Sequence, residues 1–87
     1  MARYSLLFKE SVVKDLRSIP KRDLARILKR IRTLADEPRG EASEKLSGQE
    51  RYRLPQGSYR ILHEVHDDLH GIVVVKVGHR RDITNPR

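Results

Sequence analysis

Arginine residues occur at positions that a small β-sheet would bring together. Arg51 and Arg53 are two residues apart on one predicted strand, so both side chains project from the same face of the sheet. Arg60 lies at the start of the next predicted strand, and Arg80 and Arg81 follow the last one. Alternate ends of a meander of antiparallel strands coincide, so we expect these guanidinium groups to converge on one patch.

A cluster of guanidinium groups is suited to binding phosphate. The planar fork of arginine binds phosphate oxygens in a bidentate manner and stays charged at neutral pH. Only Glu50 and Asp82 flank the group in the sequence, so we expect few acidic partners and predict an external anion as the ligand. The alternative is a solvated basic sheet face, which also discourages aggregation between strand edges.

His79 is the histidine best placed for chemistry, because it directly precedes Arg80. Imidazole titrates near neutral pH and can act as a general acid or base. The alternative for His79 is packing at the end of a strand. The other histidines, His63, His66 and His70, show no metal-ligand spacing, and the sequence predicts neither a metal nor a cofactor.

A second basic group lies on a predicted helix. Arg26, Lys29 and Arg30 could make sequence-independent contacts to the phosphates of a nucleic acid. The alternative is that they form the polar face that any amphipathic helix must have.

The composition limits the classes of function. The chain has 87 residues, which predicts one domain over residues 1–87, and it has no cysteine for disulfides or thiolate chemistry. Lys and Arg number 19 against 12 Asp and Glu, giving a net charge of +7 that favours a polyanion or an acidic protein as partner. The sequence shows no membrane-spanning apolar run and no signal peptide, so we expect a cytoplasmic protein without a membrane partner.

The apolar pattern predicts the elements that position these residues. Strands are expected over residues 4–8, 51–54, 59–65 and 72–77, turns over 55–58 and 67–71, and a first helix over 10–17. A second helix opens at Pro20, and its apolar stripe runs to Ala35. The last strand is almost entirely apolar, so we expect it to be buried on both faces.

The order of these elements is β-α-α-β-β-β. It predicts an α+β fold in which a helical hairpin packs on one face of a small, mainly antiparallel sheet.

Four segments, taken in order and spacing, resemble the RelE/ParE toxin superfamily. They are Lys45–Gly48, Arg51–Leu54, Gly57–Val65 and Val77–Ile83. The sequence Val-Gly-His-Arg-Arg-Asp that begins at Val77 is more similar to the RelE branch than to the ParE branch.

The resemblance implies the toxin of a type II toxin–antitoxin pair, with a cognate antitoxin as its partner in a hetero-oligomer. RelE-like toxins enter the ribosomal A site, beside ribosomal RNA, and cut the messenger RNA there. In this pattern Arg51 and Arg53 help bind and activate the RNA, and Arg60 and Arg80 complete the set. Many members carry a tyrosine a few residues later, where this chain has Thr84.

Two alternatives remain open within the resemblance. ParE-like toxins inhibit DNA gyrase without cutting RNA. The absence of the tyrosine at Thr84 instead suggests an RNA-binding homologue with weak catalysis.

Overall fold

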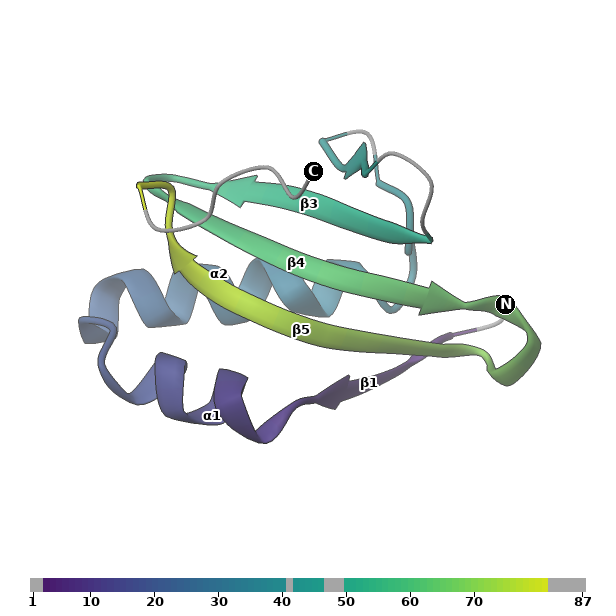
Figure 1. The fold of residues 1–87 in the computed structure, drawn as a ribbon, viewed down its shortest axis with the longest axis horizontal. Coiled ribbons are helices and arrows are strands. Elements are labelled where there is room, and N and C mark those ends of the chain that lie inside the picture. Colours follow the sequence, from purple (N-terminus) through teal and green to yellow (C-terminus); the bar gives the residue numbers. More distant parts are fainter. Residues whose placement is uncertain (1–2, 41, 47–49, 82–87) are drawn as a thin grey trace.

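A five-stranded sheet and two helices make up the fold in the computed structural model, which describes residues 3–40, 42–46 and 50–81 (Figure 1). In chain order the elements are β1 (Ser5–Phe8), α1 (Glu10–Arg17), α2 (Lys21–Thr33), β2 (Glu44–Lys45), β3 (Arg51–Gln56), β4 (Tyr59–His66), the short 3₁₀ helix η1 (Asp67–Leu69) and β5 (Gly71–His79). Each predicted helix and strand is present, with small differences at the ends.

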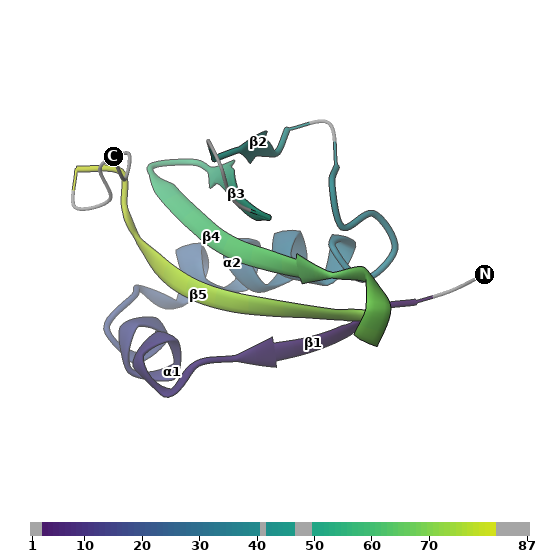
Figure 2. The ribbon, with the colours of Figure 1, turned by 45° about the vertical axis from the view of Figure 1, so that its right-hand side comes forward.

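The strands lie side by side in the order β1-β5-β4-β3-β2. β1 is parallel to β5, and the other neighbouring pairs are antiparallel. The predicted α+β class with a mainly antiparallel sheet is therefore confirmed. β2 is an additional strand at the edge of the sheet (Figure 2), and its two residues are too few to show an alternating pattern in the sequence.

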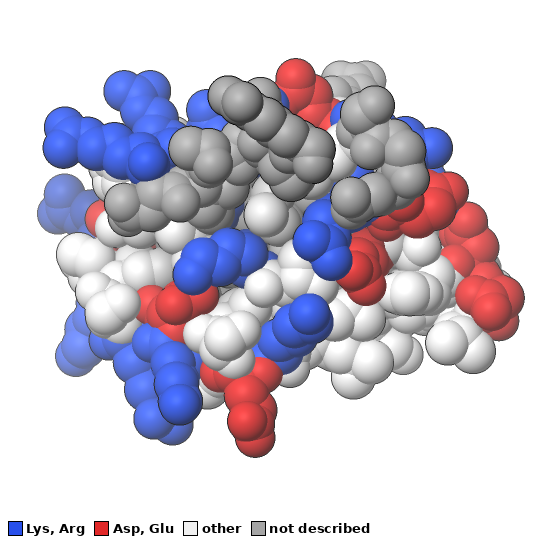
Figure 3. Space-filling model, viewed as in Figure 1, with Lys and Arg blue, Asp and Glu red and all other residues white. Residues whose placement is uncertain are grey.

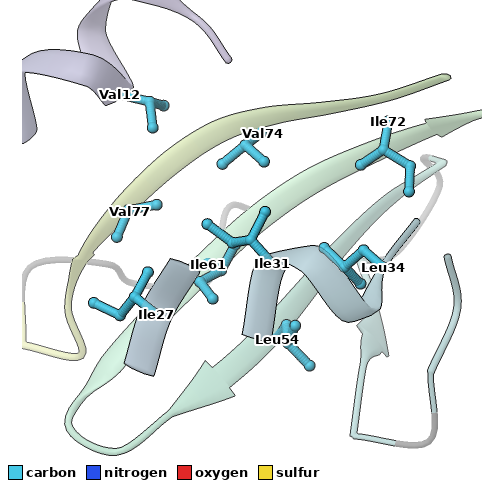
Figure 4. Packing of buried hydrophobic residues seen from close by; sticks show 9 residues of the cluster. All are labelled: Val12, Ile27, Ile31, Leu34, Leu54, Ile61, Ile72, Val74 and Val77. Atoms are coloured by element: carbon cyan, nitrogen blue, oxygen red, sulfur yellow. The ribbon is translucent and has the colours of Figure 1, made fainter. Parts of the chain in front are cut away.

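Both helices bury an apolar stripe against one face of the sheet. Val12 on α1 and Ile27 and Ile31 on α2 are at most 1% exposed. The cluster that they form with the sheet (Figure 4) contains Val12, Ile27, Ile31, Leu34, Leu54, Ile61, Ile72, Val74 and Val77. Within the described residues, neither helix is long and apolar enough to cross a lipid bilayer.

β5 is buried on both of its faces, as predicted. A smaller cluster on the face away from the helices contains Leu46, Leu62, Val73 and Val75. A bulge helps β5 serve both clusters, because Val74 pairs with His63 and Lys76 pairs with Leu62, leaving Val75 as an extra residue.

The turn between β3 and β4 is shorter than the predicted turn over residues 55–58. β3 continues to Gln56, which pairs with Tyr59, so only Gly57 and Ser58 form the turn. Gly57 has a φ of 59°, and a two-residue hairpin of type II′ needs a glycine at this first position.

Pro55 lies inside β3, opposite Arg60. The N–H of Leu46 donates to the carbonyl of Arg51 at 2.8 Å, so alternate residues of β3, beginning with Arg51, direct their backbone groups toward the β2 side. Pro55 belongs to this set, and its missing N–H therefore removes no hydrogen bond to β4.

Arg39 ties the loop after α2 to the end of β4. Its guanidinium contacts both carboxylate oxygens of Asp67, at 2.8 and 3.1 Å, and its Nε donates to the Tyr52 hydroxyl at 2.7 Å. The Tyr4 hydroxyl donates to the same carboxylate at 2.6 Å. These hydrogen bonds, that of Arg39 first, lower the pKa of Asp67 from 3.8 to about 2.

Truncation of the core should cost far more stability than truncation of the surface. Ile61 is fully buried, so Ile61→Ala should lower the free energy of unfolding by about 2–5 kcal/mol through lost burial and a residual cavity. Val13 is 42% exposed, and Val13→Ala should cost less than about 1 kcal/mol. Urea unfolding of both variants measures the difference, and equal losses would contradict the packing described.

The Asp67 contacts should also shape the acid stability of the protein. Because the pKa of Asp67 is lowered by folding, its stabilisation is complete above pH 3.8 and is lost as the pH falls toward about 2. Asp67→Asn should therefore flatten the loss of thermal stability across this window. Asp68→Asn is the matched control, since Asp68 is exposed and has no ion pair among the described residues, and it should retain the wild-type profile.

Candidate functional site

Three of the predicted site arginines share the sheet face that the helices leave uncovered. On β3, Tyr52 and Leu54 are buried toward the helices, so Arg51 and Arg53 project from the opposite face. Arg60 on β4 pairs with Pro55 and therefore projects from that same face. Figure 1 shows α2 behind the sheet, with this uncovered face toward the viewer.

Arg51 is held by a carboxylate on the neighbouring strand. It lies directly opposite Glu64, and its Nη2 is 2.6 Å from Glu64 Oε2. The hydrogen bond from Arg51, and next that from His66, lower the pKa of Glu64 against the raising effect of burial. Both side chains of the pair are about 30% exposed (31% and 28%) and sit on long strands, so Arg51 has a fixed internal partner.

Arg53 has a carboxylate partner from the edge of the sheet. Its guanidinium forms an ion pair with Glu44, which faces it from β2. The expectation that the cluster has few acidic partners is therefore wrong for Arg51 and Arg53. Both partners are distant from the arginines in the sequence, and pairing of the strands brings them together.

Arg60 differs from the two arginines on β3. The only hydrogen bond of its side chain within the described residues is a long one of 3.5 Å, from Nη1 to the carbonyl of Tyr59, and it has no ion pair there. Its neighbour on β5 is Gly78, which adds no side chain beside the guanidinium. Arg60 is thus the arginine of this face with the most freedom to bind an external anion.

The end of β5 returns to the β3–β4 turn, as predicted. The Arg80 N–H donates to the carbonyl of Ser58 at 2.7 Å, so the backbone of Arg80 is fixed beside the turn that precedes Arg60. The N–H of Arg81 donates to Nδ1 of His79 at 3.2 Å.

His79 is turned toward the helices rather than toward the arginine face. It pairs with Tyr59, and the two rings meet edge to face with their centroids 5.7 Å apart. Tyr59 packs against the cluster beneath the helices. The structure therefore places the His79 ring on the other side of the sheet from Arg53 and Arg60.

The basic residues of α2 line a separate groove. Arg26, Lys29 and Arg30 surround a space of about 260 Å³ together with Thr33 and Gln56. Nε of Arg30 is buried and has no hydrogen-bond partner among the described residues. Gln56 is the last residue of β3, so the groove lies next to the turn that precedes Arg60 and that the backbone of Arg80 contacts.

The remaining histidines have structural surroundings. His63 is fully buried, stacks on Tyr52, and lies with Nε2 3.0 Å from the carbonyl of Pro38, where it donates as the Nε2–H tautomer. Burial lowers the pKa of His63, so it stays neutral. His66 contacts Glu64 at 3.2 Å. The described residues contain no group of three or more His, Asp and Glu side chains arranged to hold a metal ion.

The charges on the uncovered face are separated between its two ends. In Figure 3, Lys and Arg side chains gather mainly toward the end that carries the β3–β4 turn, and Asp and Glu gather mainly toward the end that carries η1. Arg60 and the backbone of Arg80 lie beside the β3–β4 turn, so they belong to the basic end. Thr84 and the flanking Asp82 lie outside the described residues.

A comparison with protein families decides the membership of the chain. A family model described as the ParE toxin of type II toxin–antitoxin systems, parDE, matches residues 6–84. The chain belongs to the ParE toxin family. The predicted membership of the RelE/ParE superfamily is therefore confirmed.

Solved structures of RelE toxins resemble this toxin closely in fold. The toxin of the RelBE2 complex from Mycobacterium tuberculosis is 27% identical with a TM-score of 0.82, and the match covers 94% of this chain and 97% of that one. The match to the RelE–RelB complex of Pyrococcus horikoshii has 27% identity and a TM-score of 0.79, and it covers 95% of this chain and 100% of that one. The match to the intact Escherichia coli RelBE complex has 26% identity and a TM-score of 0.79, and it covers 87% of this chain and 95% of that one. Comparison with curated proteins finds no match.

Two carboxylates that the sequence analysis did not single out, Glu44 and Glu64, contact arginines of the candidate site. Glu64 lies within a predicted strand, but only the register of β3 on β4 shows that it faces Arg51. Glu44 depends on β2, for which the sequence gives no pattern.

Proposed function

We propose that this toxin is a ribosome-dependent endonuclease that enters the ribosomal A site and cuts messenger RNA. The observation that carries the proposal is the placement of Arg53 and Arg60 on neighbouring strands, on the sheet face that the helices leave uncovered. The backbone of Arg80 is fixed beside the β3–β4 turn that precedes Arg60. These three residues occupy positions that match the RelE pattern. The fold similarity to RelE toxins supports the same assignment.

The proposed reaction uses the 2′-hydroxyl of the RNA as its nucleophile. The 2′ oxygen forms a bond to phosphorus and the bond from phosphorus to the 5′ oxygen breaks, which leaves a 2′,3′-cyclic phosphate. One proton leaves the 2′-hydroxyl and one reaches the departing 5′ oxygen. Arg53, Arg60 and Arg80 would stabilise the charge of the pentavalent phosphate, and one well-placed donor typically contributes about 3–4 kcal/mol. Arg51 would support binding once its pair with Glu64 opens.

His79 is the proposed group for proton transfer. Arginine is a poor base because its pKa is so high. Nδ1 of His79 accepts a hydrogen bond from the Arg81 backbone N–H, and its ring packs against Tyr59. His79 can therefore act as a base on the arginine face only after this exposed hydrogen bond opens and the ring moves away from Tyr59. The place of the family's tyrosine, Thr84, supplies no substitute for this role.

The remaining basic residues fit contacts along an RNA backbone. Arg81 continues from Arg80, and the groove lined by Arg26, Lys29 and Arg30 lies next to the same turn. We propose that these residues bind phosphates of the messenger and of ribosomal RNA without reading sequence.

A cognate antitoxin is the proposed protein partner. The three structural relatives described above are toxins in complexes with RelB-type antitoxins. A net charge of +7 fits an acidic partner segment, and we propose a hetero-oligomer of toxin and antitoxin.

Inhibition of DNA gyrase is a second candidate function. It is favoured by the family model, which is that of ParE and covers nearly the whole chain. The two functions share the fold and differ in whether an RNA phosphodiester is cut.

Loss of Arg60 and Arg80 should strongly reduce cleavage while leaving the fold intact. Arg60→Gln combined with Arg80→Gln should lower the cleavage rate by at least about a hundredfold, because each side chain would stabilise the transition state. The measurement is mapping of 5′ ends on a message translated in vitro. Arg17→Gln on α1 is the control with the loss of one positive charge, and it should cut at the wild-type rate. Full activity of the folded double variant would contradict the proposed site.

A supercoiling assay separates the two candidate functions. We expect no inhibition when gyrase supercoils relaxed plasmid in the presence of the toxin at concentrations that stop translation. Inhibition of gyrase without cleavage of translated messages would replace the endonuclease proposal with the second candidate.

A further inference from the structure

The ion pair between Arg53 and Glu44 joins two very different side chains. The Arg53 side chain is 19% exposed and stands on the six-residue strand β3, whereas the Glu44 side chain is 68% exposed and stands on the two-residue strand β2. The acid is therefore the partner that can swing away, and the base is the partner that stays in place.

Arg60 stands beside Arg53 on the neighbouring strand β4. Arg53 pairs with Leu62, so Arg60 is its diagonal neighbour on the same face, at a separation of roughly 7–8 Å between Cα atoms. Arg53 first, and Arg60 more weakly, lower the pKa of Glu44, so the carboxylate is charged at neutral pH. The carboxylate thus pairs with one arginine of the proposed catalytic set, and a second arginine of that set stands on the adjacent strand.

A carboxylate and a phosphodiester present the same features to arginine. Each carries one negative charge on two oxygens that accept charge-assisted hydrogen bonds from the guanidinium fork. The position of the Glu44 carboxylate therefore marks where a phosphate could be held.

We propose that Glu44 occupies the position of an RNA phosphate at Arg53, beside Arg60, and that RNA binds by displacing it. The inference rests on the proposed nucleic-acid substrate and adds a location and an internal competitor to it. The Arg51–Glu64 pair is a poorer candidate for displacement. Both of its side chains lie on longer strands than β2, and only about 30% of each is exposed (31% and 28%).

The simplest alternative is that the Arg53–Glu44 pair only fastens β2 to β3. An exposed ion pair contributes little stability, so a fastening role would show as a small loss of thermal stability on Glu44→Gln and no gain in RNA binding. Displacement by phosphate predicts a gain in binding that depends on Arg53.

Binding of an RNA that cannot be cut provides the test. The probe is a short single-stranded RNA with every 2′-hydroxyl methylated, and the readout is its fluorescence anisotropy with the isolated toxin at low salt. Glu44→Gln should bind the probe about three- to fivefold more tightly than wild type, the change expected when an exposed competing ion pair is removed. Circular dichroism confirms that each variant is folded.

Two controls separate displacement from a general effect of charge. Asp68→Asn makes the same change in net charge in η1, which follows the far end of β4 from Arg60, and it should raise affinity much less than Glu44→Gln. In an Arg53→Gln background the gain from Glu44→Gln should disappear, because the carboxylate then has no phosphate-binding arginine to release.

Equal gains from Glu44→Gln and Asp68→Asn, persistence of the gain without Arg53, or the absence of binding by every variant would each overturn the inference. The result is independent of the nuclease assay. Tighter binding by Glu44→Gln without cleavage of translated messages would support the phosphate position and refute the endonuclease proposal. Cleavage with no special effect of Glu44 would refute only the present inference.

Discussion

The antiparallel pairing of β4 with β3 and β5 is the constraint on which the rest of the structure depends. Because side chains alternate across a strand, the register of each strand pair decides which side chains enter the core and which lie on the opposite face of the sheet. Ile61 and Leu54 enter the core beneath the helices, and the same alternation turns Arg53 and Arg60 to the uncovered face. A slip by one residue would bury the arginines and expose the core.

The uncovered face combines a concentration of positive charge with local neutralisation. Arg51 and Arg53 each have a carboxylate partner, whereas Arg60 has none among the described residues. Like charges on adjacent strands repel one another, and the two acids reduce that repulsion in the free protein. The face can therefore be strongly basic for a ligand without destabilising the sheet that builds it.

Much of the fold could be predicted from the sequence, because the amphipathic helices and alternating strands are local patterns. The pairing of Arg51 with Glu64 could not, since it depends on the turn. A four-residue turn over 55–58 would place Arg51 opposite Leu62, whereas the two-residue turn at Gly57 shifts the register by two and brings Glu64 to that position. Glu44 depends on a strand of two residues, whose position is set by its partner strand rather than by its own sequence. The grouping of Arg60 with Arg80 followed from the order of the strands alone.

Pro55 has a consequence for what the sheet can join. Its nitrogen points to the outer side of β3 beyond the end of β2, where a further strand would need a donor. An extended peptide aligned there would find one rung of its hydrogen-bond ladder missing. Growth of the sheet by recruitment of a foreign strand is thus disfavoured beside the arginine face, so a partner that binds through backbone amides gains less there than one that binds through phosphates.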